Sequence, residues 1–159
     1  MFIKNIVRFI FSFLISVLLK MPSLNNIVYQ NDMEFGFSEE ERVKVILEEY
    51  FGVLRTLDKY NPFDYENDDF LVELKSRRIK HDKYPTAMVN YSKLLKSNDS
   101  KKKRVIVFNY TDGIFVWYVN KDEYTIGKGG RCDRGCSEYY TMAFIPKEVL
   151  KDINDLAKL

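Results

Sequence analysis

The chain has 159 residues, of which 46% are hydrophobic, 15% aromatic and 30% charged, with seven glycines, four prolines, two cysteines and one histidine. This length fits one domain, and the apolar content excludes a disordered chain, a low-complexity chain and a disulfide scaffold. The net charge of +2 hides a separation, because residues 30–73 carry 4 basic and 13 acidic residues whereas residues 75–104 carry 11 and 2. Such a separation is typical of a cation site beside a surface for a polyanion.

Residues 1–22 are the most apolar part of the chain, and Arg8 and Lys20 flank their central run. The run is short for a membrane-spanning helix, which needs about 20 apolar residues, and no small-residue cleavage pattern follows it. Four interpretations stay open: an anchor, a secretory signal, an extension upstream of Met21, or a packed helix. We place the folded domain at residues 30–159, after this hydrophobic segment.

Helical and strand patterns alternate after residue 30. Ser38 followed by three glutamates is typical of a helix start, and the apolar spacing predicts a helix from Ser38 to about Leu57. Residues 63–65 and 69–76 have strand patterns. A second helix is predicted to begin at Tyr84-Pro85-Thr86, because proline suits the first helical turn.

The C-terminal half contains a hairpin signal. Asp112-Gly113 lies between apolar runs at 105–110 and 114–119, after a basic loop at 97–104. The remaining predicted elements are a glycine-rich loop over 127–137, a strand over 140–145 and a short helix from Pro146 to about Leu156. This order predicts a single α/β domain with a mixed central sheet flanked by helices.

The stretch from Asn61 to Arg78 carries the most informative polar residues. On the predicted strand, Glu73 and Lys75 share one face, and Asp64 on a neighbouring strand can reach the same place. Two carboxylates beside a backbone carbonyl form an oxygen site that suits Mg²⁺, and a nearby lysine can orient a water molecule. Phosphodiester hydrolysis requires these parts. The alternative is an ordinary amphipathic strand that pairs Glu73 with Lys75.

Pro62, Asp64, Glu73 and Lys75 match the motif of the PD-(D/E)xK nuclease superfamily, which the stretch resembles. The sequence from Phe63 through Lys83-Tyr84-Pro85-Thr86 is similar to the sequences of small nuclease-like proteins of large DNA viruses and phages. The resemblance covers residues 37–119. It implies a restriction-endonuclease-like fold, metal binding by Asp64 and Glu73, and action of Lys75 at the water.

The same resemblance implies a metal-binding glutamate in the first helix. The candidates are Glu39, Glu40, Glu48 and Glu49. Helical spacing puts Glu48 and Glu49 away from the apolar stripe, which Glu39 and Glu40 border, and we favour Glu40. The alternative is ordinary capping and dipole stabilisation at a helix start.

Several other residues are candidates for contacts with a substrate. Arg77, Lys83 and Lys93 follow the motif and are candidates for phosphate binding, with a solvated basic face as the alternative. The basic run Lys101–Arg104 precedes a strand, where gatekeeping charges are common. His81 is interpreted as a surface-loop residue that could approach a substrate. Cys132 and Cys136 are interpreted as free thiols, because one histidine and two cysteines do not complete a zinc site.

These patterns favour a Mg²⁺-dependent endonuclease that hydrolyses DNA inside a cell, with RNA as a second substrate left open. One alternative is a nucleic-acid-binding module that keeps the nuclease fold with weak or absent cleavage. The other is a membrane-anchored interaction protein held by residues 1–20. A homodimer is compatible with each of these interpretations.

Overall fold

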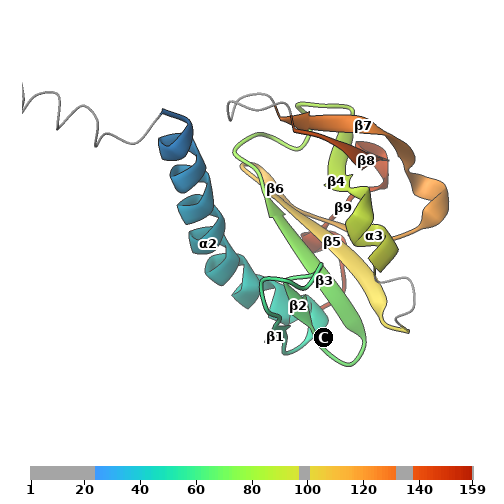
Figure 1. Cartoon of the computed structure of the whole chain (residues 1–159). Helices are drawn as coiled ribbons and strands as arrows, with labels where there is room; N and C mark the ends of the chain where they lie inside the picture. Colours follow the sequence, from blue (N-terminus) through green and yellow to red (C-terminus); the bar gives the residue numbers. More distant parts are fainter. Residues whose placement is uncertain (1–23, 97–100, 132–137, 159) are drawn as a thin grey trace, which may run out of the picture.

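A computed structural model of the chain describes residues 24–96, 101–131 and 138–158 (Figure 1). The elements, in chain order, are α2 (Leu24–Phe51), β1 (Arg55–Thr56), β2 (Tyr65–Glu66), β3 (Phe70–Ser76), β4 (Thr86–Asn90), α3 (Tyr91–Lys96), β5 (Lys103–Tyr110), β6 (Gly113–Tyr118), β7 (Thr125–Arg131), β8 (Glu138–Pro146) and β9 (Lys151–Asp152), with 3-10 turns η1 (Lys121–Glu123), η2 (Lys147–Val149) and η3 (Ile153–Asp155). They form three layers: helix α2, a first sheet and a second sheet.

The first sheet is mixed and has the strand order β1-β2-β3-β5-β6-β9. Its central strands β3 and β5 are parallel, and the other neighbours are antiparallel. The predicted hairpin is confirmed, because β5 and β6 pair across the Asp112-Gly113 turn with Val107 opposite Val116. The predicted strand 69–76 is confirmed as β3. The mixed α/β architecture therefore agrees with the sequence prediction.

Helix α2 covers one face of the first sheet (Figure 1). Its contacts are made by Val43, Leu47, Tyr50 and Phe51, which pack on Val72 and Leu74 of β3 and on Val105, Val107 and Val116. This stripe has the spacing that predicted the helix, so the buried face is confirmed. Burial of such side chains stabilises the fold by about 25 cal/mol per Å² of apolar surface.

The bounds of this helix differ from the predicted ones. Helix α2 begins at Leu24, and Ser38 lies inside it, where its hydroxyl donates a 3.0 Å hydrogen bond to the carbonyl oxygen of Phe35. The helix ends at Phe51 because Gly52 has a φ of 76° and donates its N–H to the Glu48 carbonyl oxygen. The chain then becomes strand β1, so the prediction of a helix to Leu57 was wrong.

The second sheet, with the order β4-β8-β7, covers the other face together with α3. A second core lies between the sheets, with Leu71, Ile106, Phe108 and Trp117 from the first sheet and Ala87, Val89, Ala143 and Ile145 from the second. The prediction of a sheet flanked by helices is therefore right for one face only. On the other face, strands supply most of the apolar cover.

The helix predicted to begin at Tyr84 is instead strand β4 followed by the short helix α3. Ala87 and Val89 are buried while Thr86, Met88 and Asn90 are half-buried, which is the two-residue period of a strand. Pairing with β8 stabilises this strand. The helix begins only at Tyr91, where the Asn90 carboxamide oxygen accepts a hydrogen bond from the Ser92 N–H.

The glycine-rich stretch predicted as a loop contains strand β7 in its described part. A Cβ atom at Gly127 would meet the Phe144 ring at 3.0 Å, and one at Gly129 would meet the Met88 sulfur at 2.8 Å. Only glycine fits at these two positions without a shift, because side chains of β8 and β4 pack closely against β7. The predicted closing helix is also wrong, since the segment after Pro146 consists of η2, β9 and η3.

The hydrophobic segment 1–22 lies outside the described residues, so the four interpretations of it and the domain bounds 30–159 stay predictions. Within the described ranges, no helix combines the length and the apolar character that crossing a membrane requires.

Candidate active site

Asp64 precedes strand β2 and lies close enough to Glu73 of β3 for the two carboxylates to repel each other. The β2–β3 ladder pairs Glu66 with Leu71 and Tyr65 with Val72, and Asp64 is the residue just before its last pair. The Asp64 N–H donates to the Val72 carbonyl oxygen at 3.0 Å. One carboxylate oxygen of Asp64 accepts the Leu74 N–H at 2.7 Å and so replaces a backbone acceptor in the ladder. Asp64 is therefore bonded to the backbone of the residue that follows Glu73.

Glu73 is a buried carboxylate between the two sheets. It has an exposed fraction of 0% and pairs in register with Ile106 of the inter-sheet core. Its Oε1 atom contacts the ammonium groups of Lys75, on the same strand, and of Lys93, on α3. Charged side chains are rarely buried unless they are paired, so the two lysines make this placement possible.

The electrostatics of Asp64 are unfavourable for its charged form. Burial, followed by repulsion from Glu73, raises the pKa of Asp64 from 3.8 to about 6. The Leu74 N–H and the two lysines act in the opposite direction, but they do not offset these effects. Two carboxylates held together in this way form a site that favours a bound cation.

Helix α2 brings Glu40 into the same electrostatic environment. Burial is the largest cause of the raised pKa of Glu40, and the charges of Lys75 and Glu73 also act on it. The Tyr65 hydroxyl, beside Asp64 in the chain, donates to the Glu40 backbone carbonyl oxygen at 3.2 Å. The preference for Glu40 as a third acidic residue is therefore compatible with its position.

The other three glutamates proposed for this role make different contacts. Glu39 forms a 2.6 Å ion pair with Arg42 and accepts a 2.7 Å hydrogen bond from Asn109. Glu48 accepts the Leu54 N–H at 3.0 Å at the end of α2. Glu49 pairs with Lys158 near the C-terminus. These three carboxylates thus have local structural partners, whereas Glu40 is influenced by the charges of Lys75 and Glu73.

The residues present fit a divalent cation. Among the described residues, the buried Oε2 atom of Glu73 has no hydrogen-bond partner, and such an atom is costly to bury unpaired. Asp64 and Glu73 supply carboxylate oxygens, which are the ligands that Mg²⁺ prefers. A cation there would satisfy the Oε2 atom and relieve the repulsion between the two carboxylates.

The candidates for phosphate binding occupy two places. Arg77 and Lys83 are exposed in the loop 77–85 that follows β3, as expected for residues that meet a substrate. Lys93 instead reaches Glu73 at the centre of the site. Within the basic run, Lys102 pairs with Glu66 at 2.8 Å and Arg104 donates to the Leu94 carbonyl oxygen at 2.7 Å, so both take part in structural contacts.

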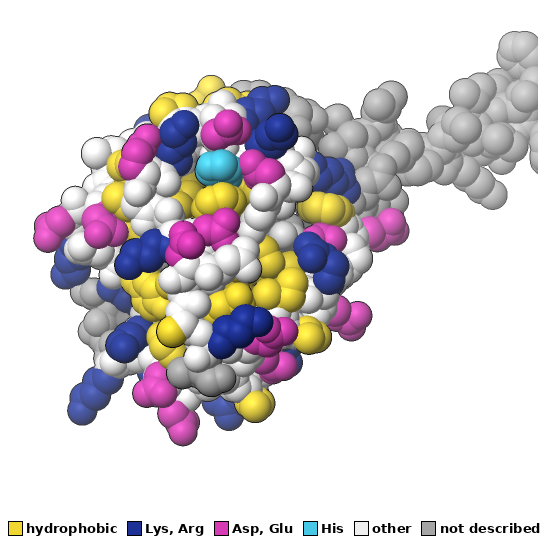
Figure 2. Space-filling view, turned by 180° about the vertical axis from the view of Figure 1, so that it is seen from behind, with side chains coloured by type: hydrophobic (Ala, Val, Ile, Leu, Met, Phe, Trp, Pro, Cys, Tyr) yellow, Lys and Arg dark blue, Asp and Glu magenta, His cyan; other side chains and the backbone are white. Residues whose placement is uncertain are grey.

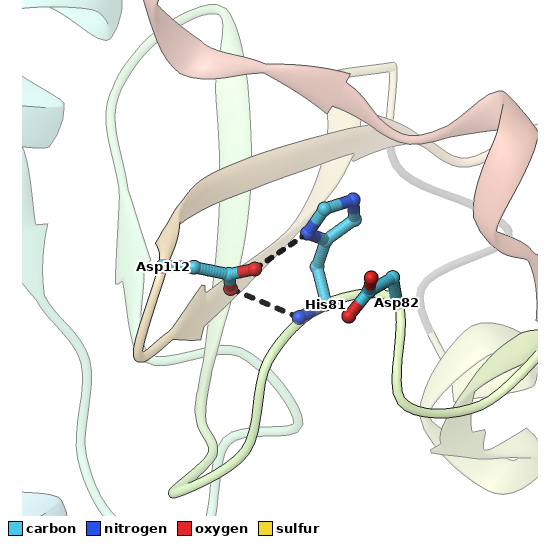
Figure 3. A group of neighbouring side chains, drawn as sticks. All are labelled: His81, Asp82 and Asp112. Carbon is cyan, nitrogen blue, oxygen red and sulfur yellow. Dashed lines mark hydrogen bonds and ion pairs between the residues drawn. The ribbon is translucent and has the colours of Figure 1, made fainter.

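His81 belongs to a second polar group that the sequence did not indicate. Its ring Nδ1 lies 2.8 Å from Asp112 Oδ2, and its backbone N–H donates to Asp112 Oδ1 at 2.9 Å (Figure 3). Asp82 completes a group whose ligand atoms lie within 4.8 Å of one another. The contact with Asp112 could not be predicted, because 31 residues separate it from His81. Cys132 and Cys136 lie outside the described residues.

The mixed sheet, with two neighbouring carboxylates and two lysines, is compatible with a nuclease-like α/β fold. The chain belongs to a phage PD-(D/E)xK endonuclease family: a family model described as "Phage putative PDDEXK endonuclease" matches residues 58–153, more than half of the chain. The matched residues include Asp64, Glu73 and Lys75, and the resemblance drawn from the sequence is confirmed. The comparisons with curated proteins and with solved structures found no match.

The pH dependence of stability should report the raised pKa of Asp64. Between about pH 4 and pH 6 the folded protein binds more protons at this group than the unfolded chain does, so its contribution to the free energy of unfolding falls as pH rises. Denaturant unfolding in EDTA at pH 4, 5, 6 and 7 should show Asp64→Asn gaining stability relative to wild type up to about pH 6. A difference that is constant with pH would contradict this prediction.

Proposed function

We propose that the protein hydrolyses phosphodiester bonds of DNA in a Mg²⁺-dependent reaction. The observation that carries this proposal is the proximity of the Asp64 and Glu73 carboxylates, which repel each other, with a buried Glu73 oxygen that has no hydrogen-bond partner among the described residues. Membership of an endonuclease family supports it. The proposed substrate also supports the expectation of an intracellular location.

In this proposal, Asp64 and Glu73 hold the metal ion and Glu40 approaches from α2. When bound, the ion supplies Lewis-acid stabilisation of the charge that develops on the phosphate. Asp64 is held for this role by the Leu74 N–H, which fixes its carboxylate on the side of Glu73. Ionisation of Asp64 is required, so activity should rise with pH near its pKa of about 6.

Lys75 acts beside the attacked phosphate. Its ammonium group contacts Glu73, and about a quarter of the side chain is exposed. An ammonium group has three N–H donors, so the contact with Glu73 leaves donors that can orient a water molecule or a phosphate oxygen. Lys93 supplies a second positive charge at the same carboxylate. The proposed contact of Lys93 with DNA is therefore at the cleavage site, whereas Arg77 and Lys83 would contact phosphates further along the DNA strand.

A binding module without cleavage is the second candidate, and the two ion pairs of Glu73 favour it. A carboxylate that two ammonium groups already neutralise is less available to a cation. In this alternative, the same basic residues hold nucleic acid, and Glu73 serves to position Lys75 and Lys93. Measurements of cleavage and of metal binding distinguish the nuclease from the binding module.

Lys75→Ala separates binding from turnover. We expect nicking of supercoiled plasmid in Mg²⁺ to fall by at least about 100-fold, the loss typical of one preorganised electrostatic group, while Mg²⁺ binding by calorimetry stays within about threefold. Lys151→Ala, an exposed lysine on the edge strand β9, is the matched control and should nick as wild type does. Wild-type protein that nicks neither DNA nor RNA with Mg²⁺ would support the binding module instead.

A further inference from the structure

A cleft of about 650 Å³ opens between the loop that follows β3 and the second sheet. Its lining is both aromatic and cationic, with Arg77, Lys80, His81, Tyr84, Tyr110 and Phe144. Figure 2 shows this face of the molecule, where hydrophobic, basic and acidic side chains gather around the single histidine. The volume is within the range of pockets that hold small organic ligands.

The cleft lies where β3 ends, and its lining residue Arg77 is two residues beyond Lys75 of the candidate active site. Lys75 and Phe108 are partners in the parallel register of β3 and β5, and Arg77 and Tyr110 follow each of them by two residues. Residues two apart on a strand share a face and are separated by about 6.6 Å. A nucleic-acid strand with a phosphate at the partly exposed Lys75 would therefore have a neighbouring nucleotide at the cleft.

The aromatic side of the cleft is held in place by several contacts. The His81 ring stacks on Phe115, with centroids 4.3 Å apart and an interplanar angle of 20°. Tyr110 meets the same Phe115 edge-on at 6.0 Å. The two hydrogen bonds to Asp112 fix His81 (Figure 3), and its second ring nitrogen faces away from that carboxylate. These rings form a rigid surface that is suited to stacking.

The loop that carries the cationic side of the cleft is anchored to the end of β5. The Arg77 N–H donates to the Asn109 carbonyl oxygen at 2.8 Å, and the Thr111 N–H donates to the Ile79 carbonyl oxygen at 3.1 Å. Tyr84 lies at the other end of this loop with 56% of its surface exposed, and the following Pro85 restricts its backbone to extended conformations. An exposed tyrosine on a restricted backbone costs little entropy to order against a ligand.

We propose that this cleft holds an unpaired nucleobase next to the cleaved phosphate, so that the substrate is single-stranded or locally unpaired nucleic acid. Tyrosine and histidine rings stack on any base, and Arg77 and Lys80 meet the adjoining phosphates. A base within a duplex is stacked and paired on both sides, so it reaches a concave pocket only after leaving the stack. This inference rests on the proposed nuclease function for its substrate, but it concerns recognition rather than cleavage.

The test measures binding in EDTA, so cleavage does not contribute. The probes are a 15-nucleotide single-stranded DNA that contains 2-aminopurine, the same sequence as a duplex, and the same sequence as single-stranded RNA. We expect the wild-type full chain to bind the single strands at least about 10-fold more tightly than the duplex, with quenching of 2-aminopurine fluorescence on stacking. The DNA and RNA arms identify which nucleic acid supplies the base.

Tyr84→Ala should weaken single-strand binding by about 10-fold and remove most of the quenching, while duplex binding stays unchanged. Tyr60→Ala is the matched control, because Tyr60 is 83% exposed, is also a loop tyrosine and does not line the cleft. Equal affinity for duplex and single strand, or unchanged quenching in Tyr84→Ala, would overturn the inference. Plasmid nicking reports the proposed function separately, because it depends on Asp64, Glu73 and Lys75.

Discussion

Asp64→Asn is expected to abolish most cleavage and to stabilise the metal-free protein. The substitution keeps an oxygen that can accept the Leu74 N–H but removes a charge that burial and Glu73 both disfavour. A pKa raised from 3.8 to about 6 corresponds to about 3 kcal/mol against the charged form. We expect Tm in EDTA at pH 7 to rise by about 6–12 °C and plasmid nicking in Mg²⁺ to fall at least about 100-fold.

The matched control for this variant is Asp68→Asn, since Asp68 is an exposed aspartate four residues further on, between β2 and β3. It should change neither Tm nor nicking. Mg²⁺ should raise the Tm of wild type more than that of Asp64→Asn, because ligand binding stabilises only a protein that keeps its site. An Asp64→Asn variant that is less stable than wild type in EDTA would contradict the electrostatic interpretation of this carboxylate.

Glu73→Gln is expected to lose activity as well, but with the opposite effect on stability. Glu73 is fully buried and neutralises Lys75 and Lys93, whose side chains are only about a quarter exposed. Removal of its charge leaves two ammonium groups without their carboxylate, which should destabilise the fold by about 2–3 kcal/mol. Thermal melts in EDTA should show a lower Tm, and plasmid nicking should fall at least about 100-fold.

Glu148→Gln, at an exposed glutamate in η2, controls for loss of a negative charge and should behave as wild type. Asp64→Asn and Glu73→Gln thus have similar kinetic effects and opposite thermal effects. A Glu73→Gln variant with wild-type nicking would show that this carboxylate is structural, and the binding-module function would then replace the nuclease function.

The sequence predicted those parts of the fold that short-range patterns determine. Strand β3 has Phe70, Val72 and Leu74 at alternate positions, and the β5–β6 hairpin has an Asp-Gly turn between apolar runs, so both were confirmed. Strand β4 was mistaken for a helix, because Tyr84-Pro85-Thr86 also resembles a helix start and only the pairing with β8 selects the strand. Local preference is a weak guide where a distant partner strand determines the conformation.

In the candidate site, too, the sequence predicted the residues that a short-range pattern indicates and missed the contacts between distant segments. Asp64, Glu73 and Lys75 were indicated by their spacing along the chain, and the pairing of β2 with β3 brings Asp64 into contact with the Leu74 N–H, beside Glu73. The contact of Lys93 with Glu73 joins residues on different elements, and the contact of His81 with Asp112 joins a loop to a hairpin turn. No periodicity within a segment encodes such pairs, so they required the three-dimensional structure.

Gly127 and Gly129, two of the three glycines of β7, determine the shape of the cleft without lining it, whereas Gly130 is part of its lining. Phe144 and Met88 are partners in the second sheet, and both line the cleft and lie against the bare backbone of β7. Any side chain at Gly129 would meet Met88 at 2.8 Å and Phe144 at 3.1 Å, so these two residues would have to shift. The positions of Met88 and Phe144, and with them the size of the cleft, therefore depend on Gly127 and Gly129, although neither glycine lines the cleft.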